Sequence, residues 1–337
     1  MAVSAATAFE AYAAFTLREL VLARLYQAQT LTIDQLCTAI PCQKTVARRV
    51  LSALLSERLA VRFPVGDPLR PRLFAYCLTP AGMSAVAELC EDDERARALY
   101  KAMPRRTAKT LAAQARHNVA ASEFFVALIR ESDPAVGRGL VLWEGPLLAA
   151  QRFLKSREGQ PPKCLLRPDA TGEYRFEDGT KLRFCLELDR GTAGLEKIAL
   201  KARRYCSHEL QDRLEGWAAL FVCPTRRRAR GVFDALVRDG DLWGPGDPAP
   251  AVSSWEEFAW AGGVLAARWL ALLDGEAAEV ALRDLALAPA AGEGGPDPEV
   301  AEFIGAPRRA PARVRGLLAP RARGAADGMT SPREEGR

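Results

Sequence analysis

The sequence predicts an α+β domain followed by an α/β domain in which helices flank a mixed sheet. Within residues 16–90, segments with a helical spacing of apolar residues come before two short apolar runs joined by a polar loop. From about residue 105 onward, short apolar strands alternate with helical segments, which indicates a second domain. A length of 337 residues suits two domains and a tail. We therefore expect a first domain over 1–90, a charged linker helix over 91–106, a second domain over 107–286 and a disordered, Arg-, Pro- and Ala-rich tail over 287–337.

The composition excludes several classes of protein. No run of about 18 apolar residues occurs, so we expect no membrane-spanning segment. The eight cysteines form no C-x-x-C pair, which is typical of reduced thiols in a cytoplasmic protein. His117 and His208 are the only histidines, so histidines cannot hold a metal unaided. A divalent metal would therefore need carboxylate ligands, which favours Mg²⁺ or Mn²⁺.

Positive charge is concentrated in two segments. The chain carries a net charge of +5, and residues 307–337 alone carry eight Arg against three acidic residues. The stretch 43–72 carries seven basic residues against two acidic ones, so the rest of the chain is close to neutral or acidic. A local basic patch predicts a partner with phosphate groups. A GC-rich genome is the alternative explanation for the many Arg and Ala residues.

The first domain has the element order of a winged helix-turn-helix. The apolar spacing predicts helices over 16–28, 32–39, 43–59 and 80–90, and strands over 59–63 and 73–78 joined by the loop 64–72. In that arrangement the third helix enters the major groove of double-stranded DNA and the loop contacts the backbone. The expected DNA-binding residues are Lys44, Thr45, Arg48 and Arg49 of the helix and Arg70 and Arg72 of the loop. The alternative is a three-helix interaction domain with a solvated basic face.

The second domain begins with a long helix, expected over 107–132 and ended by Pro134. Five strands and five further helices follow in the sequence pattern. The strands are expected over 139–143, 163–166, 174–176, 181–189 and 218–223, and the helices over 147–156, 194–216, 229–238, 254–261 and 263–273.

Acidic side chains gather around strand 181–189. Its period of two places Glu187 and Asp189 on one face, and a hairpin returns the chain from Asp169 to the neighbourhood of Glu187. Three carboxylates that converge in a pocket form a site of hard oxygen ligands for Mg²⁺. A solvated outer face of the sheet is the alternative explanation.

Lysines on the following helix complete the predicted chemistry. Lys197 and Lys201 are four residues apart and share a helix face. A lysine beside a carboxylate–metal centre can hold or deprotonate an attacking water, or offset the charge of a phosphoryl transition state. This pattern favours phosphodiester hydrolysis, whereas a solvated helix face would explain the two lysines without any chemistry.

From Arg167 to Tyr205, the pattern R-P-D…F-C-L-E-L-D-R-G-T…K-A-R-R-Y resembles the replication-relaxation family of plasmid and mobile-element proteins. His117 on the long helix and Trp143-x-Gly145 agree with this resemblance. It implies an N-terminal winged helix and a domain similar to the PD-(D/E)XK nuclease fold. The residues implied in the site are Asp169, Glu187 and Asp189 as metal-proximal acids, Lys201 as the catalytic lysine with Lys197 as second choice, and Glu144 as a fourth acid.

One position departs from the nuclease pattern. That pattern places the lysine two residues after the second acid, where this chain has Asp189. Activity then requires a lysine from the helix to reach the same space. Tyr205 lies near the proposed site, and we expect it to pack on its own helix.

The expected function is DNA binding in plasmid or mobile-element replication or mobilisation, with Mg²⁺- or Mn²⁺-dependent nicking by a relaxase-like endonuclease. A non-catalytic accessory factor or repressor with a degenerate nuclease-like domain is the first alternative, and an interaction scaffold without a DNA role is the second. The expected partners are double-stranded DNA, other relaxosome or replication proteins, and a second copy of the chain in a homodimer.

Overall fold

The computed structural model describes residues 16–66, 72–89, 108–157, 160–238, 243, 247–273 and 275–286. The predicted linker helix 91–106, the predicted tail 287–337 and Arg70 lie outside these residues. No helix in the described part is both long enough and apolar enough to cross a membrane.

The N-terminal elements follow the predicted order. They are α2 (Leu17–Ala28), β1 (Leu31–Thr32), α3 (Ile33–Ala39), α4 (Lys44–Ser56), β2 (Ala60–Pro64), β3 (Phe74–Leu78) and α5 (Pro80–Leu89). Thr16 and Thr32 each begin a helix with a capping box, in which the threonine hydroxyl and the side chain three residues later satisfy two free amides. The strands form a sheet of order β1-β3-β2. The sequence did not predict β1, because two residues are too few to show an alternation.

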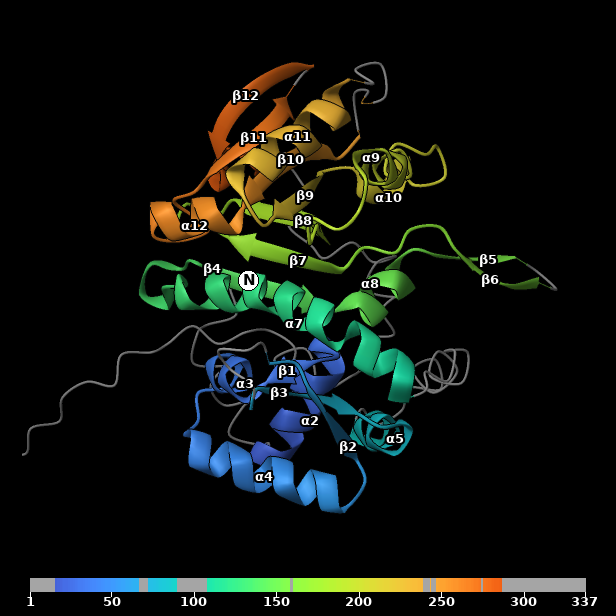
Figure 1. The fold of residues 1–337 in the computed structure, drawn as a ribbon, viewed down its shortest axis with the longest axis vertical. Helices are drawn as coiled ribbons and strands as arrows, with labels where there is room; N and C mark the ends of the chain where they lie inside the picture. The colour runs from blue at the N-terminus through green and yellow to red at the C-terminus, as the bar shows by residue number, and fades with distance from the viewer. Residues whose placement is uncertain are drawn as a thin grey trace, which may run out of the picture.

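Helix α7 (Ala108–Arg130) joins the N-terminal elements to the large sheet, and Figure 1 shows it lying between them. The Gln35 amide donates to the carbonyl oxygen of Val119 at 2.8 Å, which ties α3 to α7. Apolar side chains of α2, α7 and the sheet belong to the same hydrophobic core. The N-terminal elements therefore pack closely against the sheet domain through α7.

A mixed sheet is confirmed. In the described residues it has seven strands in the order β12-β11-β10-β9-β8-β7-β4. Their bounds are β4 Gly139–Glu144, β7 Ala170–Arg175, β8 Lys181–Leu188, β9 Trp217–Cys223, β10 Ala249–Ser254, β11 Arg268–Leu273 and β12 Glu276–Ala281. Strands β8, β9 and β10 run parallel, and every other neighbouring pair is antiparallel. The carboxyl ends of β8, β9 and β10 therefore lie at one edge.

Helices cover both faces of this sheet. Phe124 and Phe125 of α7 pack on Phe184 on one face, with ring centroids 5.8 and 5.7 Å apart. A second core on the opposite face joins α9 and α11 to β8, β9 and β10. The remaining elements are α8 (Pro146–Arg152), α9 (Leu195–Ala202), α10 (Gln211–Leu214), α11 (Arg226–Val237), α12 (Trp255–Ala261) and the 3₁₀ turns η1 (Pro134–Val136) and η3 (Leu282–Leu285).

Between α8 and β7 the chain differs from the prediction. The helix expected over 147–156 ends at Arg152, and the chain continues into β5 (Leu154–Arg157). The strand expected over 163–166 is β6 (Gln160–Cys164), which pairs with β5 in a separate two-stranded sheet. A short apolar run cannot show by itself which sheet it joins.

The largest errors lie after residue 193. The helix expected over 263–273 is wrong, because residues 268–273 form β11 between β10 and β12. An Ala- and Leu-rich segment favours a helix, and pairing on both sides overrides that preference. The helix expected over 194–216 is interrupted, because α9 ends at Ala202 and α10 begins only at Gln211.

Candidate active site

Asp169 and Glu187 lie side by side, with Asp169 directly before β7 and Glu187 on the neighbouring strand β8. Ala170 of β7 pairs with Leu186 of β8, and the register brings the residue before β7 next to Glu187. The backbone fixes the Asp169 carboxylate, because the Leu188 amide donates to its Oδ2 at 2.8 Å. The Asp169 amide in turn donates to the carbonyl oxygen of Leu186 at 3.0 Å. The predicted meeting of these two acids is therefore present in the structure.

Lys201 reaches both carboxylates from α9. Its ammonium group contacts Glu187 Oε2 directly and lies 3.8 Å from Asp169 Oδ1. Ile198 and Ala202 bury α9 against the sheet, and Lys201, on the neighbouring side of the same helix, reaches the two acids. The Glu187 side chain is 4% exposed and the Lys201 side chain is 38% exposed, so the group opens to solvent on the lysine side.

Two further side chains complete the cluster. His117 of α7 places its Nε2 2.9 Å from Asp169 Oδ1. The Tyr205 hydroxyl donates to Glu187 Oε1 at 2.5 Å. Every oxygen of the two carboxylates thus faces a protein hydrogen-bond donor or cation, which holds both groups in fixed orientations.

The two acids differ in their electrostatics. Burial raises the pKa of Glu187 from 4.5 to about 7, the charge of Asp169 adds to this rise, and Lys201 opposes it. Burial also acts to raise the pKa of Asp169, but the hydrogen bond from His117 and the charge of Lys201 lower it below its ordinary value. Burial acts to lower the pKa of Lys201, and the charges of Glu187 and Asp169 outweigh that effect and raise it. Lys201 therefore keeps its proton at neutral pH.

The raised pKa of Glu187 predicts a pH-dependent stability. Between about pH 5 and pH 7 the folded chain binds more protons at Glu187 than the unfolded chain does, so its contribution to the free energy of unfolding falls as the pH rises. Asp169 has a lowered pKa, and its contribution changes only below about pH 4. In urea titrations with EDTA, we expect wild type to lose stability relative to Glu187→Gln as the pH rises from 5 to 8. A difference that stays constant over this range would contradict the prediction.

Asp189 does not join the other acids. It lies directly after β8 and accepts a hydrogen bond from Arg228 Nε of α11 at 2.5 Å. The Gly191 amide donates to its other oxygen at 2.9 Å. Gly191 has a φ of +74°, a conformation that favours glycine in this turn. Asp189 thus ties the turn after β8 to α11 rather than facing Glu187.

Glu144 is also held by its own partner. Arg152 of α8 donates to both Glu144 oxygens at 2.9 Å, and the Thr171 hydroxyl donates to Oε2 at 2.6 Å. Both charged side chains are almost fully buried, at 5% and 7% exposed. Glu144 is therefore neutralised within the fold.

The remaining predicted residues that the structure describes lie on the surface. Lys197, one turn before Lys201, is exposed. Leu51 and Leu54 of α4 face the core. The predicted DNA-binding side chains of this helix are exposed, and they are Lys44, Thr45, Arg48 and Arg49. Lys44 pairs with Asp34 of α3 at 2.5 Å, and Arg72 is exposed in the loop before β3.

The ligand chemistry of the Asp169–Glu187 pair fits a divalent cation. Proteins hold Mg²⁺ with one or two carboxylates, and water and substrate phosphates supply the other oxygens. The two carboxylates already attract one cationic group, the Lys201 ammonium. In the described residues no group of three or more His, Cys, Asp or Glu side chains is arranged to hold a metal, so the predicted cluster of three acids is not formed.

Several partners in this region could not be predicted from the sequence. Tyr205 was expected to pack on its own helix, and instead its hydroxyl contacts Glu187. Arg152 and Arg228 were not singled out, because nothing in the local pattern pairs them with acids 8 and 39 residues away. A buried acid in an apolar strand needs a cation, and this is the signal that could have prompted a search for both.

The fold and the site define a mixed α/β protein with two acids and a lysine at the carboxyl edge of parallel strands. The family model described as replication-relaxation matches residues 22–213, more than half of the chain, and the protein belongs to the replication-relaxation family. Membership indicates a role in the replication of plasmids or mobile elements. No curated protein and no solved structure matches the chain.

Proposed function

We propose that this protein binds double-stranded DNA through its N-terminal domain and nicks one strand at the Asp169–Glu187–Lys201 site with Mg²⁺ or Mn²⁺. The observation that carries the proposal is the contact of one lysine with two acids that are 18 residues apart in the sequence. We assign the first domain as a winged helix-turn-helix and the second as PD-(D/E)XK nuclease-like. Lys201 of α9 supports the nuclease-like assignment, because it supplies the positive charge of the pattern's lysine, whose own position is occupied by Asp189 in this chain.

Each residue has a role in this proposal. Asp169 and Glu187 hold the metal ion, which when bound makes a water molecule more acidic and neutralises charge on the phosphate. Lys201 keeps its proton, so we assign it to offset the negative charge of the transition state rather than to abstract a proton. His117 and Tyr205 orient the two carboxylates through the contacts described above.

The test is nicking of a supercoiled plasmid that carries the origin or transfer region of the element encoding the protein. We expect open-circular product with Mg²⁺ or Mn²⁺ and none with EDTA. Wild-type protein that binds this DNA but leaves it supercoiled with both metals would favour the alternative, a non-catalytic accessory factor or repressor. The four carboxylate oxygens that already face protein donors support this alternative, because the two acids are then satisfied without a metal ion.

The exposed face of α4 predicts a salt-dependent duplex affinity. Arg48→Ala with Arg49→Ala removes two exposed cations, and each lost phosphate contact lowers the slope of log K against log salt by about 0.9. We expect weaker binding and a slope reduced by up to about 1.8 for the double variant in fluorescence anisotropy. Arg238→Ala, an exposed cation at the end of α11, is the control. An unchanged slope would remove the two residues from the interface.

A further inference from the structure

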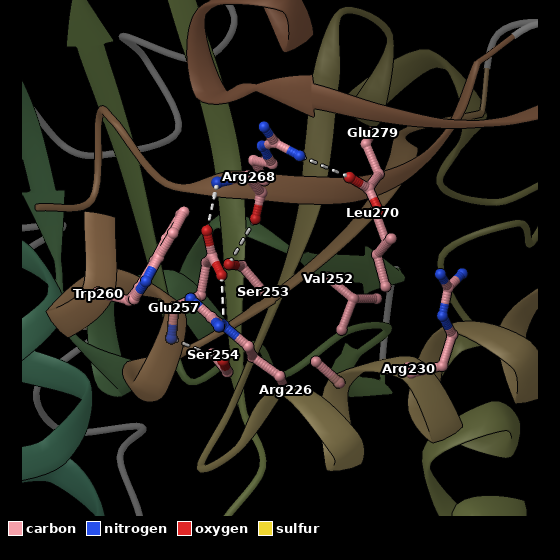
Figure 2. Close-up of a pocket in the computed structure, with 11 residues that line it drawn as sticks. Arg226, Arg230, Val252, Ser253, Ser254, Glu257, Trp260, Arg268, Leu270 and Glu279 are labelled. Carbon is pink, nitrogen blue, oxygen red and sulfur yellow. Dashed lines mark hydrogen bonds and ion pairs between the residues drawn. The ribbon is translucent and has the colours of Figure 1, made fainter.

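A cavity of about 280 Å³ lies beside the sheet where α11 and α12 meet β10, β11 and β12. Figure 2 shows Trp260 on one side of it and Arg230 on the other, with Val252 and Leu270 between them. All residues that line this cavity come after residue 213, where the family match ends. Family membership therefore assigns nothing to it.

The cavity combines cations with an exposed aromatic ring. Trp260 is 70% exposed, and the guanidinium group of Arg226 lies 4.6 Å from its ring centroid. Arg226 also pairs with Glu257 at 2.6 Å, which fixes the stacked pair in place. The ring is therefore both positioned and exposed, which allows it to contact a ligand or partner.

Arg230 differs from the other arginines at the cavity. Arg226 and Arg268 are neutralised by Glu257 and Glu279. Arg230 is exposed, and among the described residues it forms no ion pair. The net charge of the lining is therefore positive, and the uncompensated charge lies across the cavity from Trp260 (Figure 2).

The cavity and the candidate active site share one face of the sheet. Glu187 is paired in register with Phe221, Phe221 with Val252, and Val252 with Leu270. With adjacent strands about 4.8 Å apart, Val252 lies roughly 10 Å from Glu187. The start of α11 lies near both places, because Arg228 pairs with Asp189, two residues beyond Glu187, while Arg226 and Arg230 line the cavity. Arg227, between them, is exposed to solvent.

We propose that this cavity binds single-stranded DNA next to the bond that the Asp169–Glu187 site cuts, with a base stacked on Trp260 and a phosphate on Arg230. Binding of single strands by stacking aromatics beside cations tolerates any sequence, because every base has a π face. This inference rests on the proposed function. In this proposal the DNA strand lies along the start of α11 between the cut site and the cavity.

The experiment measures binding of the full chain to a fluorescein-labelled oligo(dT) and to a labelled duplex, both in EDTA so that no cutting occurs. We expect Trp260→Ala to raise the Kd for oligo(dT) by roughly 5- to 150-fold, the range for one lost stacking contact, and to leave duplex binding unchanged. Arg230→Ala is expected to lower the salt slope for oligo(dT) by about 0.7. Val136→Ala, an apolar residue 48% exposed on η1, and Arg175→Ala, exposed on β7, are the matched controls.

Equal oligo(dT) affinity for Trp260→Ala and Val136→Ala would overturn the proposal. Equal competition by poly-glutamate would also overturn it, since the cavity would then bind any polyanion. The nicking assay tests the proposed nuclease independently of the cavity. Selective loss of oligo(dT) binding in Trp260→Ala supports the cavity as a DNA-binding site even if wild type does not nick plasmid. A Trp260→Ala variant that keeps both oligo(dT) binding and nicking would reject the cavity as a DNA-binding site and leave the proposed nuclease activity standing.

Discussion

Glu187→Gln is expected to abolish metal-dependent nicking of supercoiled plasmid while leaving duplex binding intact. The substitution keeps the shape of the side chain and removes the charge that would hold a divalent ion beside Asp169. It also leaves the Lys201 ammonium with a single acidic partner. We expect the rate of nicking to fall by at least on the order of 10²-fold, measured as open-circular product over time.

The matched control is Glu196→Gln, which removes an exposed carboxylate from the first turn of the same helix that carries Lys201. We expect this variant to nick at the wild-type rate. Wild-type activity in Glu187→Gln would show that cutting happens elsewhere in the chain. Loss of duplex binding together with nicking would indicate that the substitution disturbs the fold.

Arg152→Ala is expected to destabilise the protein more than any surface substitution. Arg152 and Glu144 form a buried, two-hydrogen-bond ion pair, and removing one partner leaves the other charge buried without compensation. Such a loss costs about 3–5 kcal/mol. Arg152 also lies 5.2 Å from the ring centroid of Trp217, so the variant loses packing as well. Urea unfolding followed by circular dichroism measures the change.

The double variant Arg152→Ala, Glu144→Gln separates charge from packing. Because it removes the orphaned charge, we expect it to recover part of the lost free energy of unfolding. A double variant as unstable as the sum of the two single variants would contradict an ion pair. Glu144 would then again be a candidate metal ligand.

The core of the candidate site could be predicted from the sequence because its geometry is local. The period of two in β8 and the hairpin between β7 and β8 determine that Asp169 and Glu187 meet, and the helical period brings Lys201 above them. Asp189 was placed wrongly because the strand ends at Leu188 and the next residue no longer follows the alternation. Its partner Arg228 belongs to a helix that only the tertiary fold brings near.

The fold, like the site, could be predicted where neighbouring residues determine the structure and not where distant segments pair. Helices with capping residues, such as α3 after Thr32, were predicted close to their observed bounds. Strands β10, β11 and β12 were not predicted, because β10 and β12 are rich in Ala, β11 is rich in Leu, and all three depend on pairing with neighbours. These same strands form one wall of the cavity at Trp260, so the cavity could not be predicted from the sequence.

A crystal structure of the wild-type chain with Mn²⁺, with data collected to record the anomalous signal, tests directly whether the two acids hold a metal ion. We expect a peak between the carboxylates of Asp169 and Glu187, and no peak at the same place in an Asp169→Asn crystal. A crystal saturated with Mn²⁺ in which the Lys201 ammonium still contacts both acids, without an anomalous peak beside them, would contradict this expectation.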